Sequence, residues 1–264
     1  MVHNRQVLDD LRRNGITVLD NGETPESLAA DGIKTVVLPA HGCPVDIRER
    51  LSAAGIRAID ATCDILRQTV YQRIRDIESS GGRVVIIGDP RHAEVIAARS
   101  LSRTAQVVGS FEDIASLEPG LTKVVAICQT TITEANFLEL ANAVKLRAYP
   151  NLDIIDTRCQ PVRLRQTGVY DLARRVDAML ILGGYDSSNT RSLARIAEDA
   201  LPIGNVRHID GPEALNETDA EWFESIERLG LATGTSAPEN LPDSVIDKIR
   251  TLLSDRKDVI VGEG

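Results

Sequence analysis

Two of the four cysteines stand in the same local pattern, which suggests a shared chemical role. The segments "IRAIDATC" and "LDIIDTRC" each place an apolar run, an aspartate and two further residues before a cysteine, and an Arg-Gln-Thr triplet follows in both. The pattern predicts that Cys63 and Cys159 each lie between the end of a strand and the start of a helix, where the helix dipole favours the thiolate. Thiolates bind metals and attack electrophiles.

The distance between these two cysteines in the sequence limits the kind of metal centre that they could bind. They are too far apart in sequence for a local zinc knuckle, whereas an iron–sulfur cluster can take thiolates from separate segments. An isolated cysteine is more often a small buried apolar residue. The functional interpretation is favoured over that alternative because the pattern occurs twice.

Polar residues before a second helix-like segment suggest an anion site. Ser187, Ser188 and Asn189 precede "RSLARIAEDAL", so hydroxyl and amide donors would lie beside the positive end of a helix dipole. Helix capping is the alternative, and it needs only one of these side chains. Ser236, in "GTSAPE", presents the same choice at another helix start.

Two histidines and a glutamate add further polar chemistry at expected strand ends. His41 in "AHG" and His92 in "RHAE" are placed to donate hydrogen bonds to phosphate. Glu94 follows His92 closely, and burial in a pocket would raise its pKa and make it a proton donor. These three residues alone do not define a site.

The elements that would position these residues alternate between short apolar runs and amphipathic segments. Expected strands cover residues 35–40, 83–89, 123–129 and 178–184, and a helix-like segment follows each one. This is the βα pattern of parallel sheets covered by helices on both faces. Ligands of such sheets gather at the carboxyl ends of the strands, where the polar motifs fall. Several small α/β layers around a shared centre fit better than a single barrel, because fewer than eight βα units are convincing.

Composition excludes several classes of function. The net charge of −9 and the 3% aromatic content oppose nucleic-acid binding, which needs clustered cations and stacking side chains. No apolar run approaches a membrane span and no secretory signal opens the chain, so we expect a cytoplasmic protein with reduced thiols. The glycine-rich motifs for dinucleotides and nucleoside triphosphates are absent from the sequence, as is the G-x-S-x-G nucleophile elbow.

Taken in order, the motifs "VHN", "AHG", "DATC", "HAEV", "QTT", "DTRC", "SSN" and "TSAP" resemble one family, the 4-hydroxy-3-methylbut-2-enyl diphosphate reductases. The resemblance implies three small parallel-sheet α/β domains in a trefoil around a central site. We expect these domains over residues 1–62, 63–155 and 156–239, with residues 240–264 packing back on a truncated first domain. The resemblance also implies a 4Fe–4S cluster and a reductive dehydroxylation that yields isopentenyl and dimethylallyl diphosphates.

The resemblance also assigns roles to individual residues. It implies that Cys63 and Cys159 bind the cluster. The implied diphosphate-binding set is His3, His41, Ser187, Ser188, Asn189 and Ser236. His92, Glu94 and Thr130 fall near the substrate hydroxyl, with Glu94 as the proton source for its departure as water.

The chain also departs from the family pattern. It lacks the "GFC-x-GV" turn that carries the first cluster cysteine, and Asp64 and Asp89 replace a proline and a histidine, so we interpret it as a diverged relative. Cys128 and Cys43 are candidate third ligands, because each lies two residues from a site motif and would share its face of an extended chain. Against this, two residues span about 6–7 Å along a strand, which is beyond bonding reach. An upstream segment or another polypeptide is the alternative source.

The expected partners follow from this interpretation. They are a small-molecule diphosphate, an electron donor such as ferredoxin or flavodoxin, and a second copy or partner subunit that covers the sheet edge exposed by a truncated first domain. A cluster-free module that only binds diphosphate is the rival hypothesis. The two cysteines and the acid favour the enzyme, because a pure binder has no use for them.

Overall fold

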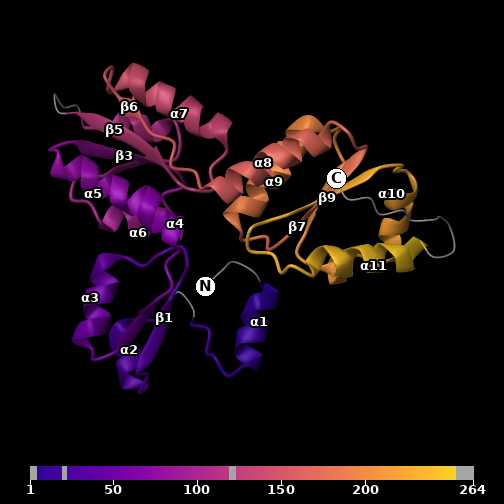
Figure 1. Ribbon diagram of the computed structural model, residues 1–264, viewed down its shortest axis with the longest axis horizontal. Coiled ribbons are helices and arrows are strands. Elements are labelled where there is room, and N and C mark those ends of the chain that lie inside the picture. The colour runs from indigo at the N-terminus through magenta and orange to yellow at the C-terminus, as the bar shows by residue number, and fades with distance from the viewer. Residues whose placement is uncertain (1–4, 20–22, 119–122, 254–264) are drawn as a thin grey trace. The chain divides into compact units, whose positions relative to one another are not determined.

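The computed structural model describes residues 5–19, 23–118 and 123–253 (Figure 1). Within these residues the chain forms three parallel β-sheets and two compact units. Residues 17–160 make one unit with two of the sheets, and residues 161–253 make the other together with helix α1 (Arg5–Arg13). The sequence had placed α1 in the first domain. None of the helices in the described residues is long and apolar enough to cross a membrane.

The first sheet is a small two-stranded layer. Strands β1 (Thr35–Leu38) and β2 (Arg57–Asp60) pair in parallel. Helices α2 (Pro25–Ala30) and α3 (Val45–Ala53) accompany them. Their shared core contains Leu28, Val36, Leu38, Leu51 and Ile56. The opposite side chains of the strands, Val37 and Ile59, remain 47% and 44% exposed, so only one face of this sheet is buried.

The second sheet has strand order β4-β3-β5-β6 and two buried faces. Its strands are β3 (Arg83–Ile87), β4 (Gln106–Val108), β5 (Val124–Cys128) and β6 (Asp153–Ile154). Its helical segments are α4 (Asp64–Leu66), a π-helical turn (Arg67–Tyr71), α5 (Gln72–Ser79), α6 (Ala93–Ser100), a 3-10 turn (Glu112–Ser116) and α7 (Glu134–Arg147).

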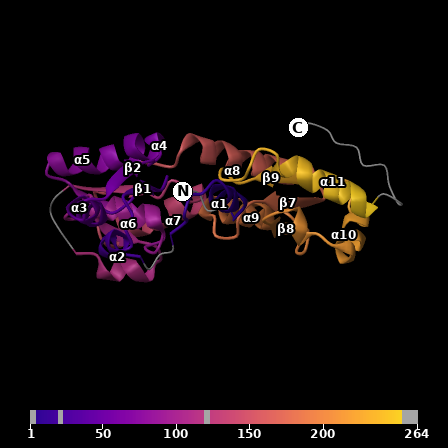
Figure 2. The same cartoon turned by 90° about the horizontal axis from the view of Figure 1, so that it is seen from below.

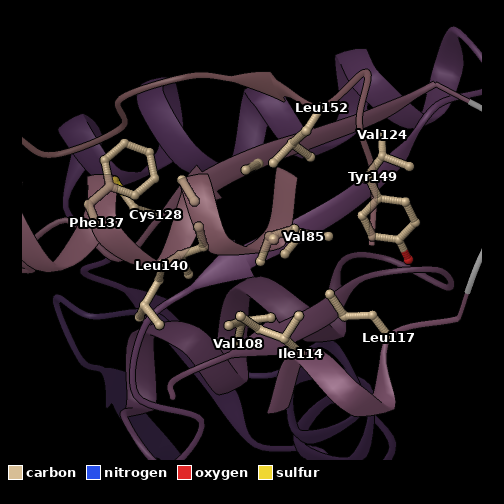
Figure 3. Packing of buried hydrophobic residues seen from close by; sticks show 14 residues of the cluster. Val85, Val108, Ile114, Leu117, Val124, Cys128, Phe137, Leu140, Tyr149 and Leu152 are labelled. Atoms are coloured by element: carbon tan, nitrogen blue, oxygen red, sulfur yellow. The ribbon is translucent and has the colours of Figure 1, made fainter. Parts of the chain in front are cut away.

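Alternate residues of β3 and β5 enter two different cores of this sheet. Val85 and Ala126 belong to the core under α7 that Figure 3 shows, whereas Ile86 and Ile127 belong to the core under α5 and α6. Burial on both faces explains why these strands read as unbroken apolar runs.

The third sheet has strand order β8-β7-β9. Its elements are α8 (Gln160–Ala173), β7 (Ala178–Leu182), α9 (Ser188–Ala200), β8 (Val206–Ile209), two 3-10 turns (Pro212–Ala214 and Glu217–Asp219), α10 (Ala220–Glu224), β9 (Leu229–Thr233) and α11 (Leu241–Leu253).

Helix α11 contributes its buried face to the core of the third sheet. Its buried residues Leu241, Val245 and Ile249 share a core with Leu180 and Leu182 of β7. Figure 2 shows α11, in yellow, beside the strands of the third sheet. The buried face of this helix therefore completes the core of the third sheet. The expected packing of residues 240–264 on the first domain stays a prediction, and residues 254–264 lie outside the described residues.

The expected fold class is confirmed: every paired strand in the described residues runs parallel to its neighbour, and helices connect most of the strands. All four expected strands form, as β1, β3, β5 and β7. The trefoil arrangement and the domain boundaries at residues 62, 155 and 239 stay predictions.

Removal of a core side chain tests the packing of the second sheet. Phe137 of α7 is fully buried, so Phe137→Ala should lower the free energy of unfolding by about 3–5 kcal/mol. Leu146 on the same helix is 84% exposed, and Leu146→Ala should change that free energy by no more than about 0.5 kcal/mol. Urea unfolding followed by circular dichroism measures both, and equal losses would contradict the assigned helix face.

Candidate functional site

A buried carboxylate lies where two strands of the second sheet end. Glu94 occupies the first turn of α6, and its backbone N–H donates to Nδ1 of His92, the residue that caps this helix, at 3.2 Å. The backbone N–H of Thr130 donates to Glu94 Oε1 at 2.7 Å, and the Thr130 hydroxyl donates to Oε2 at 2.6 Å. The parallel pairing of β3 with β5 aligns Ile87 with Cys128 and so brings these groups together.

The surroundings of Glu94 change its acidity. The side chain is buried, and burial raises the pKa of this carboxyl because the charged form loses its hydration. The two hydrogen bonds from Thr130 act in the opposite direction but do not reverse the shift. A carboxyl with a raised pKa holds its proton closer to neutral pH, which suits a proton donor.

Cys159 is connected to this group through the backbone. Its N–H donates to the Thr130 carbonyl oxygen at 3.4 Å, and the residue is half-buried immediately before α8. His92, Glu94, Thr130 and Cys159 are therefore linked by successive hydrogen bonds and short backbone steps. The structure places Cys159 between a strand and a helix, as the sequence predicted.

Cys63 and His41 follow the two strands of the first sheet. Cys63 precedes α4 and is exposed, and its N–H donates to the Ala40 carbonyl oxygen at 2.9 Å. His41 is the next residue after Ala40, so the parallel pairing of β1 with β2 brings its loop beside the cysteine. The expected strand-to-helix position of Cys63 is present in the structure, whereas His3 lies outside the described residues.

Cys128 does not suit the role of a third cluster ligand. It is the last residue of β5, fully buried, and its sulfur lies against Phe137 in the core of the second sheet (Figure 3). Burial raises the pKa of the Cys128 thiol to about 12, so the thiolate is strongly disfavoured. The Thr157 hydroxyl also lies 3.5 Å from the sulfur.

Cys43 is a weaker candidate than its sequence position suggested. It is half-buried against the core of the first sheet, and burial raises its pKa, with a smaller opposing effect from Arg48. Among the described residues, no three His, Cys, Asp or Glu side chains converge on a point that could hold a metal ion. Cys63 and Cys159 have the chemistry of cluster ligands, but the third ligand is not found among these residues.

A second polar group lies in the other compact unit, at the ends of β7 and β9. Ser187 caps α9, and its Oγ accepts the Thr190 N–H at 3.3 Å. This one side chain performs the capping role. The amide of Asn189 and the hydroxyl of Ser236 are buried without a hydrogen-bond partner among the described residues. Ser188 is the first residue of α9.

These unpartnered groups point to a ligand. A buried polar group without a partner costs about 1–3 kcal/mol, so folded proteins rarely retain one without a reason. Asn189 lies in the first turn of α9, where the helix dipole favours an anion, and Ser236 lies in the loop that follows β9. An anion that accepts hydrogen bonds here would compensate the cost, whereas capping alone would leave it unexplained.

Two buried hydroxyl groups, one in each compact unit, were not predicted from the sequence. The Tyr71 hydroxyl is buried without a described partner and presses against Gly42, where an added Cβ would lie 1.9 Å away. Burial raises the pKa of Tyr71 to about 12, so this group stays a neutral donor. Thr190 follows directly after the "SSN" motif and also has an unpartnered buried hydroxyl. Only its place beside that motif could have indicated it.

Comparison with known proteins gives the class and then the family. The chain is 33% identical over 253 residues to "4-hydroxy-3-methylbut-2-enyl diphosphate reductase" of Alkaliphilus oremlandii (strain OhILAs), covering 96% of this chain and 86% of that protein. It is 32% identical over 260 residues to the reductase of the same name from Geobacter sulfurreducens (strain ATCC 51573 / DSM 12127 / PCA), covering 97% and 86%.

Solved structures show the same architecture. A structure described as (E)-4-hydroxy-3-methyl-but-2-enyl diphosphate reductase, the terminal enzyme of the non-mevalonate pathway, matches with a TM-score of 0.62 at 31% identity, over 95% of this chain and 85% of that one. The E-1-hydroxy-2-methyl-but-2-enyl-4-diphosphate reductase from Plasmodium falciparum matches in fold with a TM-score of 0.81 at 21% identity, over 94% and 76%.

The fold and these relatives define an α/β enzyme of the oxidoreductase class. The sequence model of the LytB protein family matches residues 1–250. The chain belongs to this family, which confirms the resemblance inferred from its motifs.

The raised pKa of Glu94 predicts a pH-dependent contribution to stability. Because the folded state holds this proton above the unfolded pKa, stability falls as pH rises from the unfolded pKa through the folded one. Urea unfolding at about pH 5 and about pH 8 should show wild type losing stability relative to Glu94→Gln as pH rises. Glu139→Gln, at an exposed position on α7, is the control, and a pH-independent difference for Glu94→Gln would contradict the assignment.

The burial of the cysteines predicts an order of thiol labelling. In the reduced, cluster-free chain the exposed Cys63 should react rapidly with a thiol reagent, while the buried Cys128 should react only after unfolding. Mass spectrometry of peptides from briefly labelled protein measures this order, and Cys63→Ser should abolish the fast phase. Rapid native labelling of Cys128 would show that its sulfur leaves the core.

Proposed function

We propose that the chain is an iron–sulfur reductase that removes the hydroxyl group of an allylic diphosphate, giving isopentenyl and dimethylallyl diphosphates or close analogues. The C–O bond breaks, two electrons and two protons are taken up, and the oxygen leaves as water. The observation that carries this proposal is the buried Glu94, held by Thr130 and connected through it to Cys159.

Glu94 is the proton donor in this proposal. Its burial raises its pKa, so a neutral carboxyl is available for the departing hydroxyl, which is a poor leaving group without a proton. Thr130 fixes both carboxyl oxygens, and His92 receives the Glu94 N–H and so fixes the first turn of α6. The carboxyl is thereby oriented before substrate arrives, which reduces the reorganisation needed during reaction.

The diphosphate end of the substrate is assigned to the other polar group. Ser187, Ser188, Asn189 and Ser236 would donate to its oxygens, with His41 and His3 supplying further donors. The unpartnered Asn189 and Ser236 groups support this role, because a bound anion would satisfy them.

Cys63 and Cys159 would hold the iron–sulfur cluster. When bound, it would supply the electrons, received from a carrier such as ferredoxin or flavodoxin. No described residue is assigned as the third ligand. A second copy or a partner subunit is one source for it.

A diphosphate-binding module without a cluster is the second candidate. The lack of a three-residue metal group in the described part of the chain favours it. The raised pKa of Glu94 and its connection to Cys159 favour the reductase, because binding alone requires neither feature.

Cluster content separates these candidates. We expect the anaerobically purified and reconstituted chain to carry iron and acid-labile sulfide, and Cys63→Ser and Cys159→Ser to lose both. Cys128→Ser should retain them, because that sulfur belongs to the core. Electron paramagnetic resonance of the reduced protein provides an independent signal. A chain without iron under these conditions, even when mixed with candidate partners, would favour the binding module.

The rate of turnover tests the proposed role of Glu94 as the proton donor. With a chemical reductant and 4-hydroxy-3-methylbut-2-enyl diphosphate, Glu94→Gln should lower kcat by about a hundred- to ten-thousand-fold while the cluster signal remains. Glu139→Gln is the matched control at an exposed position. Unchanged turnover in Glu94→Gln would remove the proton-donor role.

A further inference from the structure

The hydroxyl of Thr190 is the most completely buried of the unpartnered groups at the α9 N-terminus. The residue is 0% exposed, and its Oγ1 has no hydrogen-bond partner among the described residues. Its backbone N–H is already used, since it donates to Ser187 Oγ. The hydroxyl therefore has no part in capping the helix, and its lack of a partner needs a separate explanation.

Two backbone carbonyl groups at the end of β7 already take part in hydrogen bonds. The Leu182 carbonyl oxygen accepts the Gly234 N–H at 3.0 Å, and the Gly183 carbonyl oxygen bonds to His208 Nε2 at 2.8 Å. In the first turn of a helix the usual Thr partner, the carbonyl four residues earlier, lies before the helix begins. The Thr190 hydroxyl thus remains a free donor in a buried place.

Two glycines leave room for this hydroxyl because neither carries a side chain. A Cβ added at Gly234 would lie 2.1 Å from Thr190 Oγ1 and 3.6 Å from Asn189 Nδ2, and one at Gly183 would lie 2.9 Å from Thr190 Oγ1. Thr190 and Asn189 therefore both face Gly234, at the strand end after β9. Ser236 lies two residues further along the same loop, and its unpartnered hydroxyl is also buried.

We infer that Thr190 is a further anion-binding residue, which donates its hydroxyl to the same phosphate group as Asn189 and Ser236. The inference rests on the proposed function for its diphosphate ligand and adds a donor to it. Gly234 is required because any side chain there would displace the Thr190 hydroxyl. Neutral donors at a helix N-terminus bind phosphate without a cation in contact, as hydrogen bonds to a charged acceptor are stronger than neutral ones.

Calorimetric titration of the full chain with inorganic diphosphate tests this role, and it needs neither a cluster nor turnover. Thr190→Val keeps the branched shape but removes the donor, so its Kd should rise by about tenfold or more, the effect of one hydrogen bond to a charged group. Thr190→Ser keeps the donor and should stay within about threefold of wild type. Urea unfolding should show Thr190→Val to be at least as stable as wild type without ligand, because no bond is lost and an unsatisfied buried hydroxyl is removed.

The outcomes separate this inference from the proposed function. Equal diphosphate affinity in wild type and Thr190→Val would overturn the role of Thr190 and leave diphosphate binding intact. A ligand-free Thr190→Val that is less stable than wild type would also overturn it, since the hydroxyl would then have a structural bond. Wild type that does not bind diphosphate would overturn both the inference and the diphosphate site.

Discussion

The hydrogen bonds between Thr130 and Glu94 hold together the polar group formed by His92, Glu94, Thr130 and Cys159. They join the loop after β5 to the first turn of α6, which follows β3, and β3 and β5 are adjacent parallel strands. A buried carboxylate is costly without such partners, because it loses its hydration. Two donors from one residue offset part of that cost without removing the effect of burial on the pKa. Cys159 is tied to the same loop through the Thr130 carbonyl, so one residue organises both an acid and a thiol.

The polar group of the second compact unit differs, because several of its buried donors have no hydrogen-bond partner among the described residues. Ser187 satisfies the helix end, while Asn189, Thr190 and Ser236 keep donors that the described fold does not use. Each such group lowers stability in the absence of a ligand, and each is available to one. The first group is therefore satisfied within the protein and the second is not. This contrast supports the proposed division between a group that acts on the substrate and a group that binds it.

Much of the fold could be predicted from the sequence, because burial on both faces leaves a direct trace in composition. The runs that became β3, β5 and β7 are almost wholly apolar for this reason. The sheet against which α11 packs could not be predicted, since an amphipathic helix shows which face is buried but not which sheet covers it. The strand ends also predicted where Cys63 and Cys159 fall.

Details of the site depended on packing that one sequence does not reveal. Cys128 and Thr130 were expected on one face, but β5 ends at Cys128 and the chain turns, so the alternation of a strand does not continue to Thr130. The raised pKa of Glu94 arises from complete burial, and the free hydroxyl of Tyr71 arises from its approach to Gly42. Neither burial nor approach has a sequence signature.

The small size of the first sheet has a consequence for motion. Its core is limited to one face. The start of α3 is held to α6 by the Val45 N–H, which donates to Ser100 Oγ at 3.1 Å, and the loop that follows β1 contacts the π-helical turn through Gly42 and Tyr71. A layer with few buried contacts opens at a lower free energy than the global transition. Its amide protons should therefore exchange with solvent earlier than those of β3 and β5. The loop that carries His41 would then open as part of a separate cooperative unit, while Glu94 and Thr130 stay protected.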